Sequence, residues 1–522
     1  MNPKEDDSSV EGIVGTSSIN DILAGELPKG STTALIGAPG TGTTVFCVQI
    51  AVNVLNRGGR VIFTLYDYHP VLLHKYFNFA GFDIQKSIDS GMLVIIDGYQ
   101  LLCNSMGISK AYDIEHLRPV TSDECIDVFK KEASSRYPLK DSVPHTHITD
   151  SFTALAPFID VRVANELVID GCERIRAAGN ASLIVAHEGV LEGNLVQALT
   201  RSVDGMIRLK MKWTSRGPTR ELFVEKMPFA PTGSLSMEYE ITGKGIETKH
   251  GNLRERLKTT HGLDESSEVE TRKGLALPKT ERTPTGISGL DLILEGGFPK
   301  GTFICLKGDV GTGTSTFCAQ FAWSKLLAGE KVAYYCADQT PDMVIKRFKS
   351  FGWNVEPYLD KELVLIDVFH FLTRDLRSSE KGLKGVSARR RILDNFMRTE
   401  RERIASKFGE AKVLPVIVDS FTALAPYLDL KSSYVLARMV ADSARRTDET
   451  FLAVVRSSVV EANLLHACLG TADVVIEMEN VWVRRKLMRK LRIDKMAFTS
   501  IPSRQIEYEI TTQGIRLVPQ NR

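Results

Sequence analysis

The sequence lacks the features that mark several large classes of protein. Its eight cysteines are scattered and none stands in a CxxC pair, so neither a zinc ribbon nor a disulfide framework is expected. No run reaches the roughly 18 consecutive apolar residues that a membrane span needs. The first nine residues are polar and acidic, unlike a signal peptide. We therefore expect a cytoplasmic protein with no membrane partner.

An excess of charge of one sign is also missing. The 66 Lys and Arg residues against 64 Asp and Glu residues leave a formal charge of +2. No global field attracts the protein to nucleic acid, so any basic site must be local. A hydrophobic content of 43% with 25% charged residues is typical of a folded globular protein, and 522 residues are too many for one small core.

An internal duplication organises the chain. The segment Asp150 to Pro157 recurs 269 residues later as Asp419 to Pro426, and the glycine-rich segments 37–44 and 308–315 pair at nearly the same offset. This period is too long for a solenoid and predicts two tandem domains. The expected division is a disordered N-terminus at 1–9, domain 1 at 10–248, a linker at 249–280, domain 2 at 281–518 and a tail at 519–522.

Short apolar runs alternate with longer amphipathic stretches in both halves. These runs predict strands at about 32–36, 60–65, 93–96, 146–149 and 182–186, and again at about 303–307, 331–336, 363–366, 414–418 and 451–455. Strands that are apolar on both faces and separated by helix-length segments indicate a parallel sheet covered on both sides. Alternating residues at 220–226 and 237–241 indicate antiparallel strands, so each domain is predicted to be α/β with an antiparallel C-terminal extension.

The two glycine-rich segments match a phosphate-binding loop in every respect but one. Each follows a predicted strand and precedes a predicted helix, where backbone N–H groups and a helix N-terminus can hold an anion. The lysine of the G-x-x-x-x-G-K-[ST] pattern is replaced by threonine in both copies. The predicted nucleotide-binding residues are Gly37, Gly40, Thr41, Gly42, Thr43 and Thr44, and Gly308, Gly311, Thr312, Gly313, Thr314 and Ser315.

The missing lysine affects turnover more than binding. A hydrogen bond to a charged group contributes roughly 1.5–3 kcal/mol, so its loss should weaken phosphate binding about 10- to 150-fold. Removing one donor to a transition state typically costs about 100- to 1,000-fold in rate. We therefore expect a nucleotide binder before a fast hydrolase.

Magnesium ligands are retained in both copies. Thr44 and Ser315 keep the hydroxyl that contacts the ion in such loops, and Asp150 and Asp419 end apolar runs as a second acidic ligand does. An acid at a strand end is often only a helix cap. ATP or ADP with Mg²⁺ is the expected cofactor.

With these residues in place, the sequence resembles the two-domain KaiC-like ATPases of the RecA superfamily, especially their archaeal members. The segment Thr285 to Asp291, then Gly296 to Gly301, then the second glycine loop follows the family order. The resemblance covers nearly all of both halves. It implies RecA-like P-loop domains, degenerate in the lysine position, and a homo-oligomer, commonly a hexameric ring with nucleotide at subunit interfaces.

The resemblance also assigns candidate catalytic residues. The family's paired glutamates after the second strand appear as single shorter acids, Asp67 and Asp338, which are candidate bases or ordinary loop acids. Lys226 and Lys495 match the family's Lys-Met motif and are candidate fingers that reach a neighbouring subunit's nucleotide. The arginine that usually follows the methionine is absent, so the finger is reduced to one charge.

Three functions fit these residues. The first is a KaiC-like ATP-binding regulator in signal transduction, at most a slow ATPase, with an unknown regulatory protein partner. The second is a RecA-type protein that handles DNA through the basic run at 484–492 beside Trp482, although such a run is more often a solvated face. The third is an interaction scaffold that binds no ligand.

The ten histidines supply no metal motif. His147 lies within a predicted strand and His187 follows one, but no HExxH or comparable zinc spacing exists. Metal binding beyond nucleotide-bound magnesium is therefore not expected.

Overall fold

The computed structural model describes most of both halves of the chain. The described residues are 27–68, 70–98, 144–155, 161–188, 199–214, 217–228, 235–242, 245–248, 281–371, 396, 398–400, 402–406, 408, 415–428, 430–458, 462–483, 486–499 and 505–518. The predicted linker and both chain ends lie outside them.

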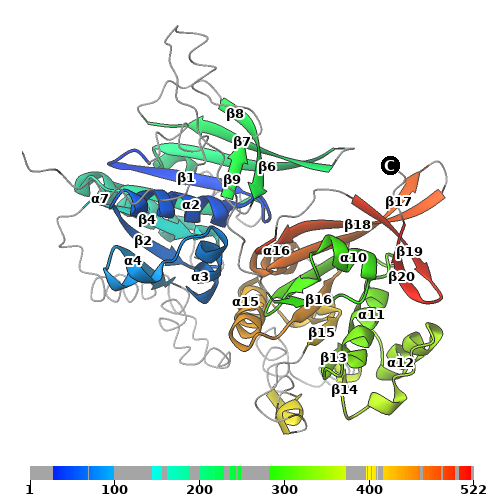
Figure 1. Cartoon of the computed structure of the whole chain (residues 1–522). Coiled ribbons are helices and arrows are strands. Elements are labelled where there is room, and N and C mark those ends of the chain that lie inside the picture. The colour runs from blue at the N-terminus through cyan, green and yellow to red at the C-terminus, as the bar shows by residue number, and fades with distance from the viewer. Residues whose placement is uncertain are drawn as a thin grey trace, which may run out of the picture.

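The first half is built on one nine-stranded sheet (Figure 1). Its strands, in the order in which they lie across the sheet, are β3 (Leu93–Asp97), β2 (Arg60–Leu65), β4 (His145–Asp150), β5 (Ala181–His187), β1 (Ser31–Gly37), β6 (Gly205–Thr214), β7 (Gly217–Lys226), β8 (Leu235–Thr242) and β9 (Gly245–Thr248). In this order across the sheet, neighbouring strands pair in parallel from β3 as far as β6 and antiparallel from β6 to β9. The α/β class and its antiparallel extension are confirmed.

The second half repeats this order strand for strand. Its sheet contains β14 (Leu363–Asp367), β13 (Val332–Cys336), β15 (Val416–Asp419), β16 (Phe451–Val455), β12 (Phe303–Gly308), β17 (Val474–Val483), β18 (Lys486–Met496), β19 (Gln505–Thr511) and β20 (Gly514–Leu517). A short ribbon of β10 (Arg282–Thr283) and β11 (Phe298–Pro299) precedes it. Every strand predicted from an apolar run is present within about three residues of its expected bounds.

Helices cover the sheets. The first half has α2 (Thr43–Asn56), α3 (Pro70–Phe79), α4 (Gln85–Asp89), the 3-10 turn η2 (Phe152–Leu155) and α7 (Val161–Ala178). The second half has α10 (Ser288–Ile293), α11 (Thr314–Leu327), α12 (Pro341–Ser350), η3 (Glu356–Tyr358), η5 (Phe421–Tyr427), α15 (Leu430–Thr447) and α16 (Ala462–Thr471). Among the described residues, no helix is both long and apolar enough to span a membrane.

The strand that feeds each glycine loop lies inside its sheet, between two parallel neighbours. β1 lies between β5 and β6, and β12 lies between β16 and β17. Strand β1 is buried along its whole length, which explains its unbroken apolar and threonine sequence. The six described cysteines are all buried, as expected for inert thiols. The carboxyl ends of these central strands form the edge at which the candidate site lies.

Candidate functional site

Both glycine loops have the same backbone shape. Gly40 and Gly42 have φ values of 88° and 93°, and Gly311 and Gly313 have values of 86° and 95°. These left-handed conformations favour glycine, and they lead directly into the N-termini of α2 and α11. A tyrosine from the antiparallel extension supports each loop, because Tyr239 donates a hydrogen bond to the Thr41 carbonyl and Tyr508 to the Thr312 carbonyl. The loops are therefore preformed.

The hydroxyl and the acid expected at a magnesium site lie together in each half. Thr44 Oγ1 donates to Asp150 Oδ2 over 2.9 Å, and Ser315 Oγ donates to Asp419 Oδ1 over 3.1 Å. Both aspartates end the strand beside β5 or β16 and are buried. Burial raises the pKa of Asp150 and of Asp419 above the ordinary carboxyl value. A cation near either carboxylate would oppose that shift, so these groups fit Mg²⁺.

Each glycine loop has one threonine whose hydroxyl closes the loop and another at the lysine position. The Thr41 hydroxyl donates to the Ala38 carbonyl over 2.7 Å, and the Thr312 hydroxyl donates to the Asp309 carbonyl over the same distance. These hydroxyls close their own loops. Thr43 and Thr314, at the lysine position, are both 5% exposed. Threonine is uncharged, so neither side chain can supply the positive charge that lysine brings to a bound polyphosphate.

Asp67 is held by three side chains. Ser151 and Tyr434 both donate hydrogen bonds to its carboxylate, and His187 Nε2 lies 3.2 Å from its Oδ2. Burial alone would raise the pKa of Asp67. The hydrogen bond and charge of His187, together with the hydrogen bonds from Ser151 and Tyr434, outweigh burial, and the pKa is lowered. Burial likewise acts to lower the pKa of His187, and Asp67 raises it above the ordinary value. The ionised forms stabilise each other.

The second half surrounds its acids with arginines instead. Arg456, which stands 269 residues after His187, places a guanidinium nitrogen 2.7 Å from Asp338 Oδ2. Arg347 lies 3.7 Å from Asp419 Oδ2 and also donates to Gln339. Its charge opposes the rise in the pKa of Asp419 that burial causes. The two sites thus share a backbone but not a charge distribution.

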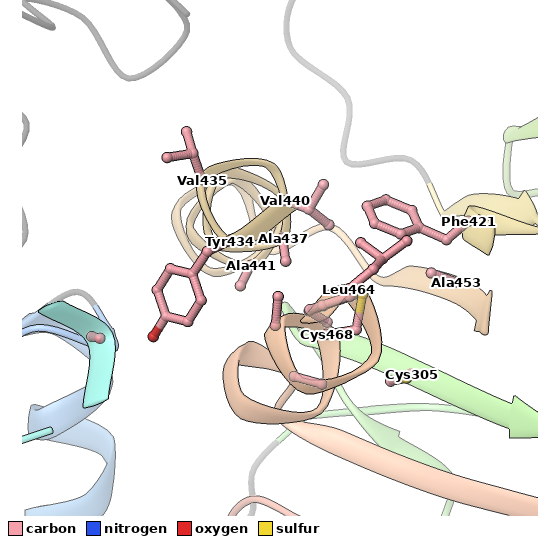
Figure 2. Packing of buried hydrophobic residues seen from close by; sticks show 14 of the residues in the cluster. Cys305, Phe421, Tyr434, Val435, Ala437, Val440, Ala441, Ala453, Leu464 and Cys468 are labelled. Atoms are coloured by element: carbon pink, nitrogen blue, oxygen red, sulfur yellow. The ribbon is translucent and has the colours of Figure 1, made fainter. Parts of the chain in front are cut away.

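The second half also contacts the glycine loop of the first half. A pocket of about 100 Å³ is lined by the first loop with Asp67 and His187 on one side, and by Arg445, Asp473 and Lys495 on the other. A Cβ on Gly40 would overlap the carbonyl oxygen of Asp494, so the two backbones touch there. The ring of Phe498 packs 5.0 Å from that of Tyr76. Figure 2 shows Tyr434 projecting from α15 toward the first half.

The cations in this pocket are partly engaged. Lys495 Nζ donates to the Gly470 carbonyl over 3.3 Å, and Arg445 pairs with Asp473 over 2.8 Å. Burial lowers the pKa of Lys495 below its ordinary value. An anion in the pocket would stabilise its protonated form. Lys495, the candidate finger of the second half, therefore lies at the first glycine loop of the same chain.

The other predicted finger is placed differently. Lys226 Nζ donates to the carbonyl of Val203, over 2.6 Å, within its own half. The second glycine loop is more open than the first, since Val310 is 73% exposed. A Cβ on Gly311 would meet a single atom, Asn480 Nδ2, at 3.5 Å. Within the described part of one chain, the second half thus covers the first loop, whereas the second loop remains more exposed.

The basic run at 484–492 is partly paired within the sheet, as far as it is described. Arg492 forms ion pairs with Glu477 and Asp494, and Lys490 donates to Gln505 over 3.0 Å. Arg484 and Arg485 lie outside the described residues. Trp482 beside them is 72% exposed. These ion pairs fit a strand pair that carries its own countercharges, which reduces the case for a DNA-binding surface.

Some residues of the site have no counterpart among the sequence predictions. His187 is the last residue of β5 and lies at the same sheet edge as Asp150. Its position directly after an apolar run was the one sequence feature that could have indicated a place in the site. Arg456 could have been found from the 269-residue offset. Tyr434 and Arg445 lie on α15, more than 360 residues from Asp67, and no local pattern connects them with it.

Comparisons with known proteins agree with this geometry. The family model described as "ATPase: KaiC" matches residues 13–252 and again residues 283–522. The chain belongs to the KaiC ATPase family. This confirms the predicted resemblance and the tandem RecA-like P-loop domains.

Curated relatives of two lengths are found. A UPF0273 protein of Thermotoga maritima is 30% identical over 247 residues, which are 46% of this chain and 96% of that protein. A UPF0273 protein of Pyrococcus horikoshii is 30% identical over 246 residues, with 46% and 95% covered. The circadian clock oscillator protein KaiC of Parathermosynechococcus lividus is 22% identical over 533 residues, with 99% and 87% covered. The shorter relatives therefore match about one half of this chain, and KaiC matches both.

Proposed function

We propose that this KaiC-family chain is an ATP-binding regulator that hydrolyses nucleotide slowly or not at all. The observation that carries the proposal is the pair of preformed loops, each with its hydroxyl and acid 2.9–3.1 Å apart and each with threonine in place of lysine. The N–H groups of such a loop and the helix N-terminus behind it bind the phosphates. Thr44 with Asp150, and Ser315 with Asp419, would hold the Mg²⁺ that neutralises them.

Slow hydrolysis follows from the state of the candidate bases. Asp67 already accepts hydrogen bonds from Ser151 and Tyr434 and faces His187, and its lowered pKa makes it a weaker proton acceptor. Asp338 is held by Arg456. Neither acid is poised to take a proton from water, and neither loop has the lysine that stabilises the transferring phosphoryl group.

The two sites are proposed to differ in affinity. Lys495 lies in the pocket of the first loop and offers part of the positive charge that the missing lysine would supply. In a half-buried site, one such charge-assisted contact contributes roughly 1.5–3 kcal/mol. Among the described residues, the cation that touches the more open second loop is Arg489, whose exposed guanidinium donates to the Gly311 carbonyl over 3.3 Å and is screened by solvent. The first half should therefore bind nucleotide more tightly.

The open second loop also supports a proposal for assembly. Within one chain the second half covers the first loop, whereas the corresponding first-half surface, with Lys226 and the exposed Arg176–Asp204 pair, covers nothing described. A second copy placed head to tail would bring that surface to the second loop. Such a head-to-tail interface between unlike surfaces generates a ring when its rotation closes, and a ring of six domains would require three chains. Nucleotide-dependent assembly and an unidentified regulatory protein would then form the switch.

Direct calorimetry tests nucleotide binding. ATP and ADP are titrated into the whole chain with and without Mg²⁺, and phosphate release is measured on the same samples. We expect binding in the presence of Mg²⁺ with little release. Ser315→Ala and Thr44→Val, which remove the two hydroxyls, should each weaken only the Mg²⁺-dependent part of binding at one site. Absence of any heat with millimolar ATP would overturn the proposal and favour a scaffold without ligand.

A further inference from the structure

We propose that Asp67, Asp150 and His187 form a binding site for a divalent transition-metal ion in the first half alone. One ligand atom from each of these three buried or nearly buried residues lies within 4.8 Å of the others. The three residues come from the carboxyl ends of adjacent strands or directly after them: β2, β4 and β5. The rigid sheet therefore fixes the spacing of the ligand atoms.

The distances suit a shared cation. His187 Nε2 and Asp67 Oδ2 lie 3.2 Å apart. Ligand bonds of roughly 2.0–2.2 Å to nitrogen and oxygen place two neighbouring ligand atoms about 3 Å apart around one ion. All three ligand atoms lie within 4.8 Å of one another, which is slightly more than the diameter of about 4.0–4.4 Å of such a coordination shell. Small side-chain rotations would bring all three atoms to bonding distance.

The same three-residue site contains a buried oxygen without a hydrogen-bond partner. Asp150 is 1% exposed, and its Oδ2 accepts hydrogen bonds from Thr44 and Tyr68. Its Oδ1 is buried and has no hydrogen-bond partner. An unsatisfied carboxylate oxygen costs about 1–3 kcal/mol or more, which a bound cation would offset. The adjoining pocket of about 100 Å³ has room for an ion and its waters.

The orientation of the His187 ring also suits a metal ligand. Its Nδ1 lies 3.3 Å from the carbonyl oxygen of Gly37. A proton on Nδ1 can be donated to that carbonyl, which leaves the lone pair of Nε2 directed at the two carboxylates. Metal-binding histidines generally have their second nitrogen held by such an acceptor.

The second half provides an internal contrast. At the position of His187 it has Arg456, which pairs with Asp338, and at the position of Tyr76 it has Arg347, which lies 3.7 Å from Asp419. Arginine keeps its charge at any ordinary pH and cannot ligate a metal. Guanidinium groups there supply a permanent countercharge, whereas His187 and Tyr76 at these positions of the first half do not. The difference in sequence thus coincides with the difference in charge around the acids.

The donor set selects the kind of ion. One imidazole nitrogen with two carboxylates suits Mn²⁺, Fe²⁺, Co²⁺ or Zn²⁺, whereas Mg²⁺ and Ca²⁺ prefer oxygen ligands throughout. The site needs no nucleotide, although Asp150 also belongs to the proposed Mg²⁺ site. A test without nucleotide therefore leaves the nucleotide proposal standing if it fails.

The test is a titration of the full chain with Co²⁺ in the absence of nucleotide, followed by visible absorption. We expect one Co²⁺ per chain, with ligand-field bands that a large excess of Mg²⁺ does not remove. His187→Arg, which installs the residue of the second half, should weaken binding at least 100-fold. His147→Val removes a different histidine of the same half and should leave binding unchanged.

Two further results guard against a folding artefact. Asp67→Asn keeps the size of the side chain and should weaken Co²⁺ binding at least 10-fold, while circular dichroism of each variant reports folding. Mn²⁺ should bind the native chain with the same stoichiometry, measured by loss of the electron paramagnetic resonance signal of the free ion. Absence of Co²⁺ bands in the native chain, bands unchanged by His187→Arg, or equal competition by Mg²⁺ would overturn the proposal.

Discussion

A methyl group at Gly40 should separate the two halves of the chain, whereas a methyl group at Gly311 should not. Both glycines have φ values near 87°, so alanine at either position costs about 1–2 kcal/mol in backbone strain. At position 40 the added Cβ would also come closer to the Asp494 carbonyl oxygen than the 3.0 Å that real Cβ atoms keep. At position 311 its single neighbour is a flexible amide 3.5 Å away. Gly311→Ala is therefore the matched control.

The extra cost at position 40 can be worked from the contacts that would open. Phe498 is 7% exposed and packs on Tyr76, and burial of a phenylalanine contributes about 1.5–3 kcal/mol. The hydrogen bond from Tyr434 to the Asp67 carboxylate contributes about another 1.5–3 kcal/mol. Gly40→Ala should therefore destabilise the chain by about 3 kcal/mol or more beyond Gly311→Ala.

Hydrogen exchange gives the decisive readout. Without nucleotide, Gly40→Ala should accelerate amide exchange in residues 494–499 and 70–79, which face each other across the contact, and Gly311→Ala should leave both segments at their native rates. Urea unfolding measures the difference in free energy. Equal destabilisation by the two variants, with unchanged exchange at 494–499, would refute the packing of the first loop against the second half.

Two other expectations concern charge. Thr314→Lys should tighten ATP binding by the second half about 10- to 150-fold in calorimetry. Thr43→Lys should have a smaller effect on the first half, because Lys495 already lies in the first pocket. The reverse order of the two effects would contradict the role of Lys495 as a substitute for the missing lysine. Burial lowers the pKa of His147 to about 4, whereas its pKa in the unfolded chain is about 6.5. The unfolded chain therefore binds the proton first as the pH falls. The free energy of unfolding should decrease as the pH drops from 6.5 toward 4. The loss at pH 5 is about 2 kcal/mol relative to pH 7.5, and His147→Val should remove it in urea unfolding at the two pH values.

The fold could be predicted from local patterns. Apolar runs predicted the central strands because a parallel strand buried on both faces must be apolar throughout, and the glycines marked the loops because positive φ excludes most other residues. The pairing of Thr44 with Asp150 was also accessible, since both lie at the carboxyl edge of one sheet. These features depend on short stretches of chain or on known strand order.

The surroundings of Asp67 could not be predicted in this way. Its partner Tyr434 is 367 residues away and reaches it only because the second half packs against the first. The prediction that no histidine binds metal rests on the absence of an HExxH pattern, which describes spacing along one helix only. His187 meets the acids across three strands of a sheet, and strand order, unlike helical spacing, leaves no fixed interval in the sequence.

The two halves share the backbone shape of their glycine loops but differ in the charge around the neighbouring acids. Asp338 and Asp419 face Arg456 and Arg347, whose guanidinium groups remain protonated at any physiological pH. Asp67 and Asp150 face an imidazole, whose charge depends on its neighbours. We expect the permanent countercharge to make the second site less sensitive to cations in solution. In the first site, where Lys495 lies nearby, a proton on His187 or the proposed metal ion would supply the charge that arginine supplies in the other. An equal backbone geometry with unequal countercharge fits the proposal that the two halves bind nucleotide and respond to different signals.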